Sequence, residues 1–311
     1  MSEDEVEFRS DMTVELVRAH ASDTDVLFAA RVSTQGEQTL ERAKADADEP
    51  RTTEKRDRGL INYLMRDRHG SPFEHNSMTF YVQAPIFVFR EFMRHRIASY
   101  NEESGRYREL RPVFYVPARE RALVQVGKPG AYEFLPGDDG QHDLVDRLTR
   151  ERSVAAYASY REMLDAGVAR EVARIVLPLN LYSSMYVTMN ARSLMNFLSL
   201  RTKHPASTFP SFPQREIELC AEAMETHWAG LMPHTHAAFT ANGRVAPERA
   251  ASPPSAPRRL PARRVAARMP SSCAIRRGLP WRRRRVGRSR SGTRARRQDG
   301  RRLGRGRRAS G

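Results

Sequence analysis

The chain has 311 residues, which is enough for one large domain or two ordinary ones. Its net charge of +16 is uneven: residues 247–311 hold 22 Arg, no Lys and two acidic residues, which leaves 31 basic and 35 acidic residues in 1–246. Attraction to polyanions is therefore a property of the C-terminal segment. Two cysteines, Cys220 and Cys273, are too few for a disulfide framework or a zinc cluster.

The N-terminal residues and the hydropathy indicate where in the cell the protein is located. The first residues are acidic and do not read as a signal peptide, and no apolar run is long enough to cross a bilayer. A cytoplasmic protein without a membrane anchor is therefore expected.

The first quarter of the chain alternates strand and helix patterns. Apolar and polar residues alternate over 12–17, which predicts a strand, and Asp23 with Thr24 can cap a short helix. The charged residues 41–58 indicate a solvated loop or helix. An apolar helical stripe follows over 60–65 and is expected to stop at Gly70.

The next elements lead into the polar centre of the chain. Alternation returns over 77–83, which predicts a second strand. Pro85 suits the first turn of a helix that turns Phe89 and Met93 inward, together with Ile86. This helix should carry residues 94–96 at its C-terminal end.

The rest of the domain is expected to be mainly helical. Residues 111–143 are rich in Pro, Gly and Asp and indicate loops with one strand at most, whereas apolar spacing predicts a long helix over 144–163. Further helices are expected from 170 to a stop near Pro178, over 187–201, and over 214–231 with Pro233 closing the last. Many helices and few strands favour an α+β domain with a small antiparallel sheet.

Residues 247–311 have a different composition from the domain at 1–246. They contain no Tyr or Phe, almost no acid, and mostly Arg, Pro, Ala, Gly and Ser, so they should be disordered. One interpretation is a basic arm that binds nucleic acid or a membrane surface through phosphate contacts. The other is a frame-shifted extension, because GC-rich DNA read out of frame encodes these residues. The domain's own use of 27 Arg against 4 Lys favours the second.

The most informative run is Arg-His-Arg-Ile-Ala-Ser-Tyr-Asn-Glu-Glu-Ser-Gly-Arg-Tyr at 94–107. Three cationic or potentially cationic groups stand side by side, followed by a polar stretch and another Arg. A buried charge without a partner is costly, whereas guanidinium forks match phosphate oxygens two at a time. The run therefore predicts a phosphate-binding pocket. The alternative is a solvated basic corner paired with Glu91 and Glu102.

The same run resembles the RHRxxSxNxxSxRY signature of the flavin-dependent thymidylate synthases. Every specified position is filled, by Arg94, His95, Arg96, Ser99, Asn101, Ser104, Arg106 and Tyr107. The segments 69–75, 170–178 and 190–201 also resemble the family. The likeness extends over roughly residues 10–246, in family order.

This resemblance implies a fold and a reaction. The family fold is α+β, and its members are homotetramers whose flavin sites lie where subunits meet. The implied reaction is methylation of dUMP to dTMP, with 5,10-methylenetetrahydrofolate as carbon donor and FAD passing a hydride derived from NADPH. The alternative from another class is a nucleic-acid-binding protein that acts through the basic tail.

The resemblance also implies ligand contacts. Those to FAD are His69, Ser71, Arg94, His95, Arg96, Glu102, Asn190, Ala191, Arg192 and Asn196. Those to dUMP are Glu91, Arg94, Glu102, Glu103, Ser104, Gly105, Arg106, Arg174 and Arg201. From the residues alone, Asn190 could instead cap a helix, and Arg106 and Arg174 could form surface ion pairs. Some family members carry Gln at the position of Glu91, and the role of His204 stays open.

Arg201 is the expected catalytic residue. It ends the apolar helical segment 194–200, so its guanidinium should emerge from a packed wall. A fixed guanidinium beside a uracil can stabilise negative charge that develops on the ring. Carbon 5 then becomes nucleophilic without a thiolate on carbon 6, and the resemblance assigns this role to Arg201.

Two other chemistries are disfavoured. Cys220 recurs with Ile217, Met224 and Trp228 at helical spacing, which predicts a packed core thiol rather than a nucleophile. The two histidines and the glutamate of 69–75 match no helical zinc spacing, so no metal site is expected.

Overall fold

The computed structural model describes residues 6–38, 54–128 and 131–248. All of them belong to one compact unit, Met1–Ala256. The predicted loop or helix at 41–58 lies largely outside the described residues. The tail from residue 249 on also lies outside the described residues. Both interpretations of the tail, and its nucleic-acid function, concern residues that the structure does not describe.

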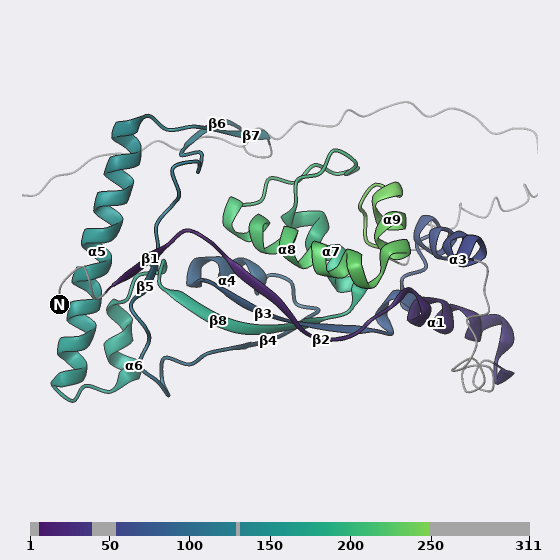
Figure 1. Ribbon diagram of the computed structural model, residues 1–311, viewed down its shortest axis with the longest axis horizontal. Coiled ribbons are helices and arrows are strands. Elements are labelled where there is room, and N and C mark those ends of the chain that lie inside the picture. The colour runs from purple at the N-terminus through teal and green to yellow at the C-terminus, as the bar shows by residue number, and fades with distance from the viewer. Residues whose placement is uncertain (1–5, 39–53, 129–130, 249–311) are drawn as a thin grey trace, which may run out of the picture. The chain divides into compact units, whose positions relative to one another are not determined.

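A four-stranded antiparallel sheet organises the domain (Figure 1). Its order is β2 (Thr13–His20), β3 (Ser77–Pro85), β8 (Tyr182–Met189) and β4 (Ser99–Glu102). Alternate side chains of β3 are fully buried, namely Met78, Phe80, Val82 and Ala84. The strands predicted at 12–17 and 77–83 are therefore confirmed, and the α+β class with a small antiparallel sheet is as expected.

Helices from both halves of the chain complete the main core. α7 (Ala191–Arg201) packs on α8 (Arg215–Leu231), and α8 also contacts β2 and α4 (Ile86–Phe92). Figure 1 shows α7 and α8 along the sheet, with α9 (Pro233–Ala241) beside α3 (Glu54–Arg66). The buried aromatic side chains of this cluster are Phe73, Phe80, Phe89, Phe92, Phe197, Trp228 and Phe239.

A second hydrophobic cluster lies under the long helix α5 (Asp139–Asp165). It joins β5 (Val113–Tyr115), which pairs in parallel with β1 (Glu7–Arg9), to the short helix α6 (Arg170–Ala173). The 3-10 turn η3 (Arg174–Val176) then ends before Pro178, as predicted. The other elements are α1 (Asp23–Gln35), the 3-10 turn η2 (Ser71–Glu74), β6 (Val124–Lys128) and β7 (Ala131–Leu135).

The largest error of the sequence prediction concerns β8. The helix expected over 187–201 begins only at Ala191, and the preceding residues form the inner strand that pairs with both β3 and β4. Tyr182–Met189 buries alternate side chains at Met185, Val187 and Met189, which is the strand period. The apolar run continues into the helix, so the change of period was missed.

Two further elements differ from the prediction. Residues 111–143 hold three strands, β5, β6 and β7, rather than one at most. Pro233 closes α8 as expected but also opens α9, because a proline is well tolerated at the first position of a helix.

The ends of individual helices also differ from the prediction. The cap of α1 is Ser22, whose hydroxyl accepts from the Asp25 amide at 3.3 Å, rather than Asp23 or Thr24. α3 ends at Arg66, before the stop expected at Gly70, and Arg68 takes the left-handed conformation at φ 62°. Met93, predicted to face inward, is 45% exposed because α4 stops at Phe92.

Candidate active site

Arg201 lies at the C-terminal end of α7, against the end of α4. Its Nε donates to His95 Nε2 at 3.1 Å, and its Nη1 forms an ion pair with Glu91. One turn earlier, Phe197 stacks on Phe92 with ring centroids 4.9 Å apart and meets the His95 ring edge-on. The guanidinium therefore emerges from a packed wall, as the sequence predicted.

His95 is uncharged at neutral pH. Burial, and then the neighbouring charge of Arg201, lower the pKa of His95 to about 4. A neutral imidazole with its proton on Nδ1 leaves Nε2 free to accept from Arg201. Tyr100 supports this turn, because its hydroxyl donates to the carbonyls of Phe92 and His95 at 2.7 and 2.9 Å. Only the flanking arginines of the 94–96 run therefore carry charge, and both are exposed.

A second group surrounds Glu102, at the end of β4. The Ser183 hydroxyl donates to Glu102 Oε1 at 2.9 Å. Burial raises the pKa of Glu102, although Ser183, Arg90 and Arg174 act in the opposite direction. A Cβ on Gly105 would stand 2.9 Å from Cδ1 of Leu110 and 3.3 Å from Cδ of Arg174, so glycine permits the close packing of both side chains. Sequence reasoning missed Arg90 and Ser183, which carry no motif of their own.

Arg106 occupies the exposed side of this second group. Its Nε pairs with Glu171 at 2.8 Å, and both side chains are more than half exposed. Its backbone amide donates to Ser104 Oγ at 3.3 Å, and Glu103 pairs with Arg108 at 3.6 Å. The surface ion pair considered from the sequence is therefore present, and an exposed pair of this kind can be exchanged for an anionic ligand.

A third group lies at the N-terminal end of α7. Asn190 caps the helix by accepting from the Ser193 amide at 2.9 Å, which confirms the capping alternative. Arg192 forms an ion pair with Glu74. A side chain at Gly70 would collide with the Arg192 guanidinium, so the segment holding His69 and Ser71 passes close to α7. His69 and Ser71 are both exposed.

The predicted residues thus form three patches. The first holds Glu91, Arg94, His95, Arg96 and Arg201; the second holds 102–106 and Arg174; the third holds His69, Ser71 and 190–192. The 11 residues of α7 separate the first patch from the third by about 16 Å. Within the described residues of one chain, the guanidinium groups of Arg106 and Arg201 have separate partners.

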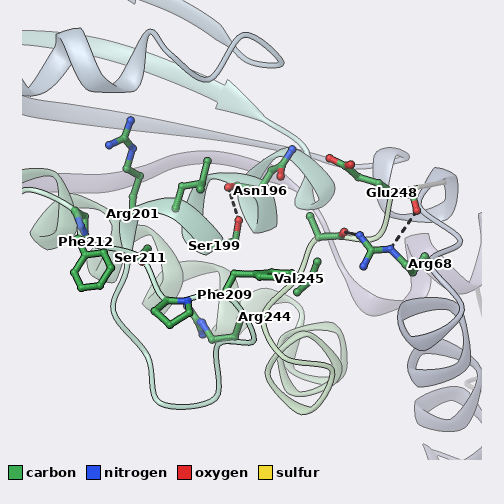
Figure 2. A pocket seen from close by; sticks show the side chains of 14 residues that line it. Arg68, Asn196, Ser199, Arg201, Phe209, Ser211, Phe212, Arg244, Val245 and Glu248 are labelled. Carbon is green, nitrogen blue, oxygen red and sulfur yellow. Dashed lines mark hydrogen bonds between the residues drawn. The ribbon is translucent and has the colours of Figure 1, made fainter. Parts of the chain in front are cut away.

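A pocket of about 440 Å³ adjoins Arg201 (Figure 2). Its walls come from α7, from the loop after α7, and from the C-terminal segment of the domain. Lining residues include Asn196, Ser199, Arg201, Phe209, Phe212 and Val245. Asn196, the remaining predicted FAD contact, thus lies between the first and third patches. His204 is outside this pocket, and its Nδ1 accepts from the Ala206 amide at 3.1 Å.

Cys220 is unsuited to nucleophilic catalysis. It has no exposed surface, and burial raises the pKa of its thiol to about 12. The prediction of a packed core thiol is confirmed. Among the residues that the structure describes, no group of three or more His, Cys, Asp or Glu side chains could hold a metal ion. Within the same residues, no helix is long and apolar enough to cross a membrane.

Comparison with known proteins places this arrangement in a class. Residues 15–234 match the family described as thymidylate synthase complementing protein. A flavin-dependent thymidylate synthase of Streptomyces coelicolor is 66% identical over 243 residues, covering 78% of this chain and 96% of that protein. One from Thermotoga neapolitana is 43% identical over 226 residues, covering 73% and 89%.

A solved structure gives the same result. The UMP/dUMP methylase PolB of Streptomyces cacaoi, bound with 5-Br dUMP, superposes with a TM-score of 0.71 at 56% identity, covering 78% of this chain and 100% of that one. The chain therefore belongs to the flavin-dependent thymidylate synthase family, and the expectation of an enzyme of this type is confirmed.

Proposed function

We propose that the protein methylates dUMP at carbon 5 to give dTMP, in the cytoplasm. 5,10-Methylenetetrahydrofolate would donate the carbon, and NADPH would reduce a bound FAD. Family membership and the likeness to a dUMP methylase support the reaction class. The observation that carries the proposal is Arg201, fixed by Glu91 and His95 at the wall of a pocket while the only described cysteine is buried and protonated.

The first and third patches fit FAD. Arg94 and Arg96 are exposed guanidinium groups suited to pyrophosphate, and the N-terminus of α7 at 190–192 favours negative charge. The close packing at Gly70 brings Ser71 to the same helix end. When bound, FAD would supply hydride transfer. His95 would offer a neutral ring, and Asn196 an amide with both donors and an acceptor.

The second patch fits the nucleotide. Arg106 and Arg174 would hold the monophosphate with the Ser104 hydroxyl, and the phosphate would take the place of Glu171 on Arg106. Gly105 would let the backbone approach the ligand. The Arg201 guanidinium would stabilise the negative charge that builds on the uracil ring as carbon 5 attacks. Glu91, Glu102 and Glu103 would orient the nucleotide through hydrogen bonds.

We further propose that neighbouring subunits of a homotetramer bring the three patches together. Large apolar side chains next to the patches are exposed in the single chain: Ile97 at 71%, Tyr107 at 81% and Ile175 at 75%. Such groups are typical of surfaces that partners cover. Mixing Arg106→Ala protein with Arg201→Ala protein should restore turnover, because mixed tetramers would hold some sites with both arginines intact. No recovery after subunit exchange would contradict shared sites.

Release of tritium from 5-tritiated dUMP tests the reaction. The purified protein should be yellow, and it should release tritium with methylenetetrahydrofolate and NADPH but much less without NADPH. Cys220→Ala should release tritium at a rate near that of the wild type. No release from folded, flavin-loaded protein would refute the proposal, and a folded but inactive Cys220→Ala would point back to thiol catalysis.

A further inference from the structure

A buried arginine lies beneath the candidate active site, and the family signature does not include it. Arg244 lies in the turn after α9 in the left-handed conformation, at φ 54°, and only 1% of its side chain is exposed. Its Nη1 and Nη2 donate to the two carboxylate oxygens of Glu225 at 2.6 and 2.7 Å. The guanidinium also lies 5.0 Å from the centre of the Phe239 ring.

This ion pair is tied to the residue that follows Arg201. Arg244 Nη2 also donates to the Thr202 hydroxyl at 2.9 Å, and that hydroxyl donates to the Leu198 carbonyl at 2.7 Å. Thr202 therefore joins Arg244 to the last turn of α7. A cation near a helix C-terminus is favourable, because the exposed carbonyl groups there carry partial negative charge.

The segment around Arg244 also forms a wall of the pocket. We call residues 243–248 the closing segment. Gly243 accepts from the Thr208 amide at 2.9 Å, and Arg68 donates to the Ala246 and Glu248 carbonyls at 3.3 and 3.4 Å. Figure 2 shows Arg244, Val245 and Glu248 along the side of the pocket that faces α7.

The loop after α7 is fixed from the same side. Ser211 donates to the Thr202 carbonyl at 2.6 Å, and the Lys203 amide donates to Glu218 at 2.9 Å. The end of α7 that carries Arg201 is thus linked to Arg244 through Thr202. The Arg201 guanidinium itself is bound by Glu91 and His95.

We propose that Arg244 is a positioning residue for Arg201: through Thr202 it fixes the end of α7, so that the Arg201 guanidinium stays in place against Glu91 and His95. The inference rests on the proposed function, since Arg201 is the residue that would stabilise the developing charge. A misplacement of about 1 Å can cost about 100-fold in rate. Removing the tie therefore lowers kcat. It changes KM for dUMP little, because the second patch, which would hold the phosphate, is elsewhere.

Two variants break the tie in different ways. Arg244→Met removes the charge, and Thr202→Val removes only the hydroxyl that links Arg244 to α7, so the Glu225 pair remains in a folded protein. Both should lower kcat by about 10-fold or more with KM for dUMP within about threefold. The double variant should lose little more than either single one, because both changes break one linkage. Arg244→Lys should be intermediate, since one ammonium cannot bind Glu225 through two parallel bonds.

The position of Arg201 can be followed without turnover. Histidine titration by NMR, assigned with His95→Asn, reports the nearby guanidinium because burial, and then the charge of Arg201, lower the pKa of His95. In Thr202→Val and Arg244→Met, that pKa should rise from about 4 toward the ordinary 6.5. Phe114→Ala, in the second hydrophobic cluster, is the control for general destabilisation and should leave both kcat and the His95 titration near wild type.

The outcomes separate the two proposals. If the wild type releases no tritium, the proposed function fails, while the His95 titration still tests the link between Arg244 and Arg201. An unchanged kcat per bound flavin and an unchanged His95 pKa in folded Thr202→Val would overturn the positioning role. The role would also be overturned if Phe114→Ala lowered kcat as much.

Discussion

Two arginine–glutamate pairs lie on either side of the C-terminal end of α7, and they differ in what surrounds them. In Arg244–Glu225 the side chains are 1% and 17% exposed, and the carboxylate also accepts from His236 at 2.8 Å. In Arg201–Glu91 they are 19% and 27% exposed. The Arg244 guanidinium is therefore enclosed by protein, whereas both members of the second pair are partly exposed to solvent.

The comparison shows how one chemical pairing can serve two purposes. Removing one member of an enclosed pair strands a buried charge, so the pair acts as a permanent tie. A pair that solvent reaches contributes little to stability and can exchange partners. The Arg201 guanidinium can therefore exchange its partner for a ligand more readily than the Arg244 guanidinium can.

The largest expected effect is on stability, from Glu225→Ala. This change leaves the Arg244 charge buried without its carboxylate and should lower the free energy of unfolding by about 3–5 kcal/mol. Urea denaturation measures the difference. Glu151→Ala, which breaks the exposed Arg147–Glu151 pair on α5, should change it by less than about 1 kcal/mol. Equal losses in the two variants would remove the distinction between enclosed and exposed pairs.

The next effect is on turnover, from Arg201→Ala. Loss of a donor aimed at developing charge should lower kcat by about 100- to 1,000-fold. Flavin absorbance should persist, because the first and third patches keep their other polar groups. Steady-state kinetics on flavin-loaded protein measures the change, with Arg66→Ala, at an exposed arginine of α3, as the matched control. Substantial turnover without Arg201 would end its proposed role.

The free energy of unfolding should fall in two steps as the pH is lowered. Folding lowers the pKa of His95 from 6.5 to about 4, so the unfolded chain binds more protons and stability falls as pH drops through this window. Burial opposes ionisation of Glu225, but Arg244 and His236 hold its pKa at about 2 instead of 4.5, and stability falls again below pH 4.5. Urea unfolding between pH 7 and pH 3 should show both steps.

Single variants assign the two steps. His95→Asn should remove the step between pH 6.5 and 4 and leave the lower one. Glu225→Gln should remove the lower step and leave the upper one. A pH profile that neither variant alters would mean that other groups govern acid unfolding.

The smallest effect is expected from Glu91→Gln. Glutamine keeps an acceptor oxygen for Arg201 and loses only the charge of a partly exposed pair, so the free energy of unfolding should change by less than about 1 kcal/mol. Thermal denaturation and kcat together measure the outcome. A loss as large as that of Glu225→Ala would show that the Arg201 pair is structural after all.

Much of the site could be predicted from the sequence, because a run of specified polar residues can be recognised without knowing which distant residues it contacts in the fold. The 94–107 run, the packed thiol of Cys220 and the wall that ends at Arg201 are examples. β8 was missed because its place between β3 and β4 depends on partners about a hundred residues away. Arg244 was missed because a single arginine before a basic tail gives no pattern. Its burial depends on Glu225 and Thr202, which reach it only in the folded chain.

Because the closing segment lies late in the chain, the pocket is completed late in synthesis. Residues 243–248 are the last described part of the chain to be synthesised, yet they form one wall of the pocket beside Arg201. A ribosome that stalls before residue 244 would release a chain that has every described strand and helix, but not the Arg244 guanidinium that pairs with Glu225. Such a product would have the architecture of the enzyme with an open cavity, and His236 would be the remaining described partner of the Glu225 carboxylate.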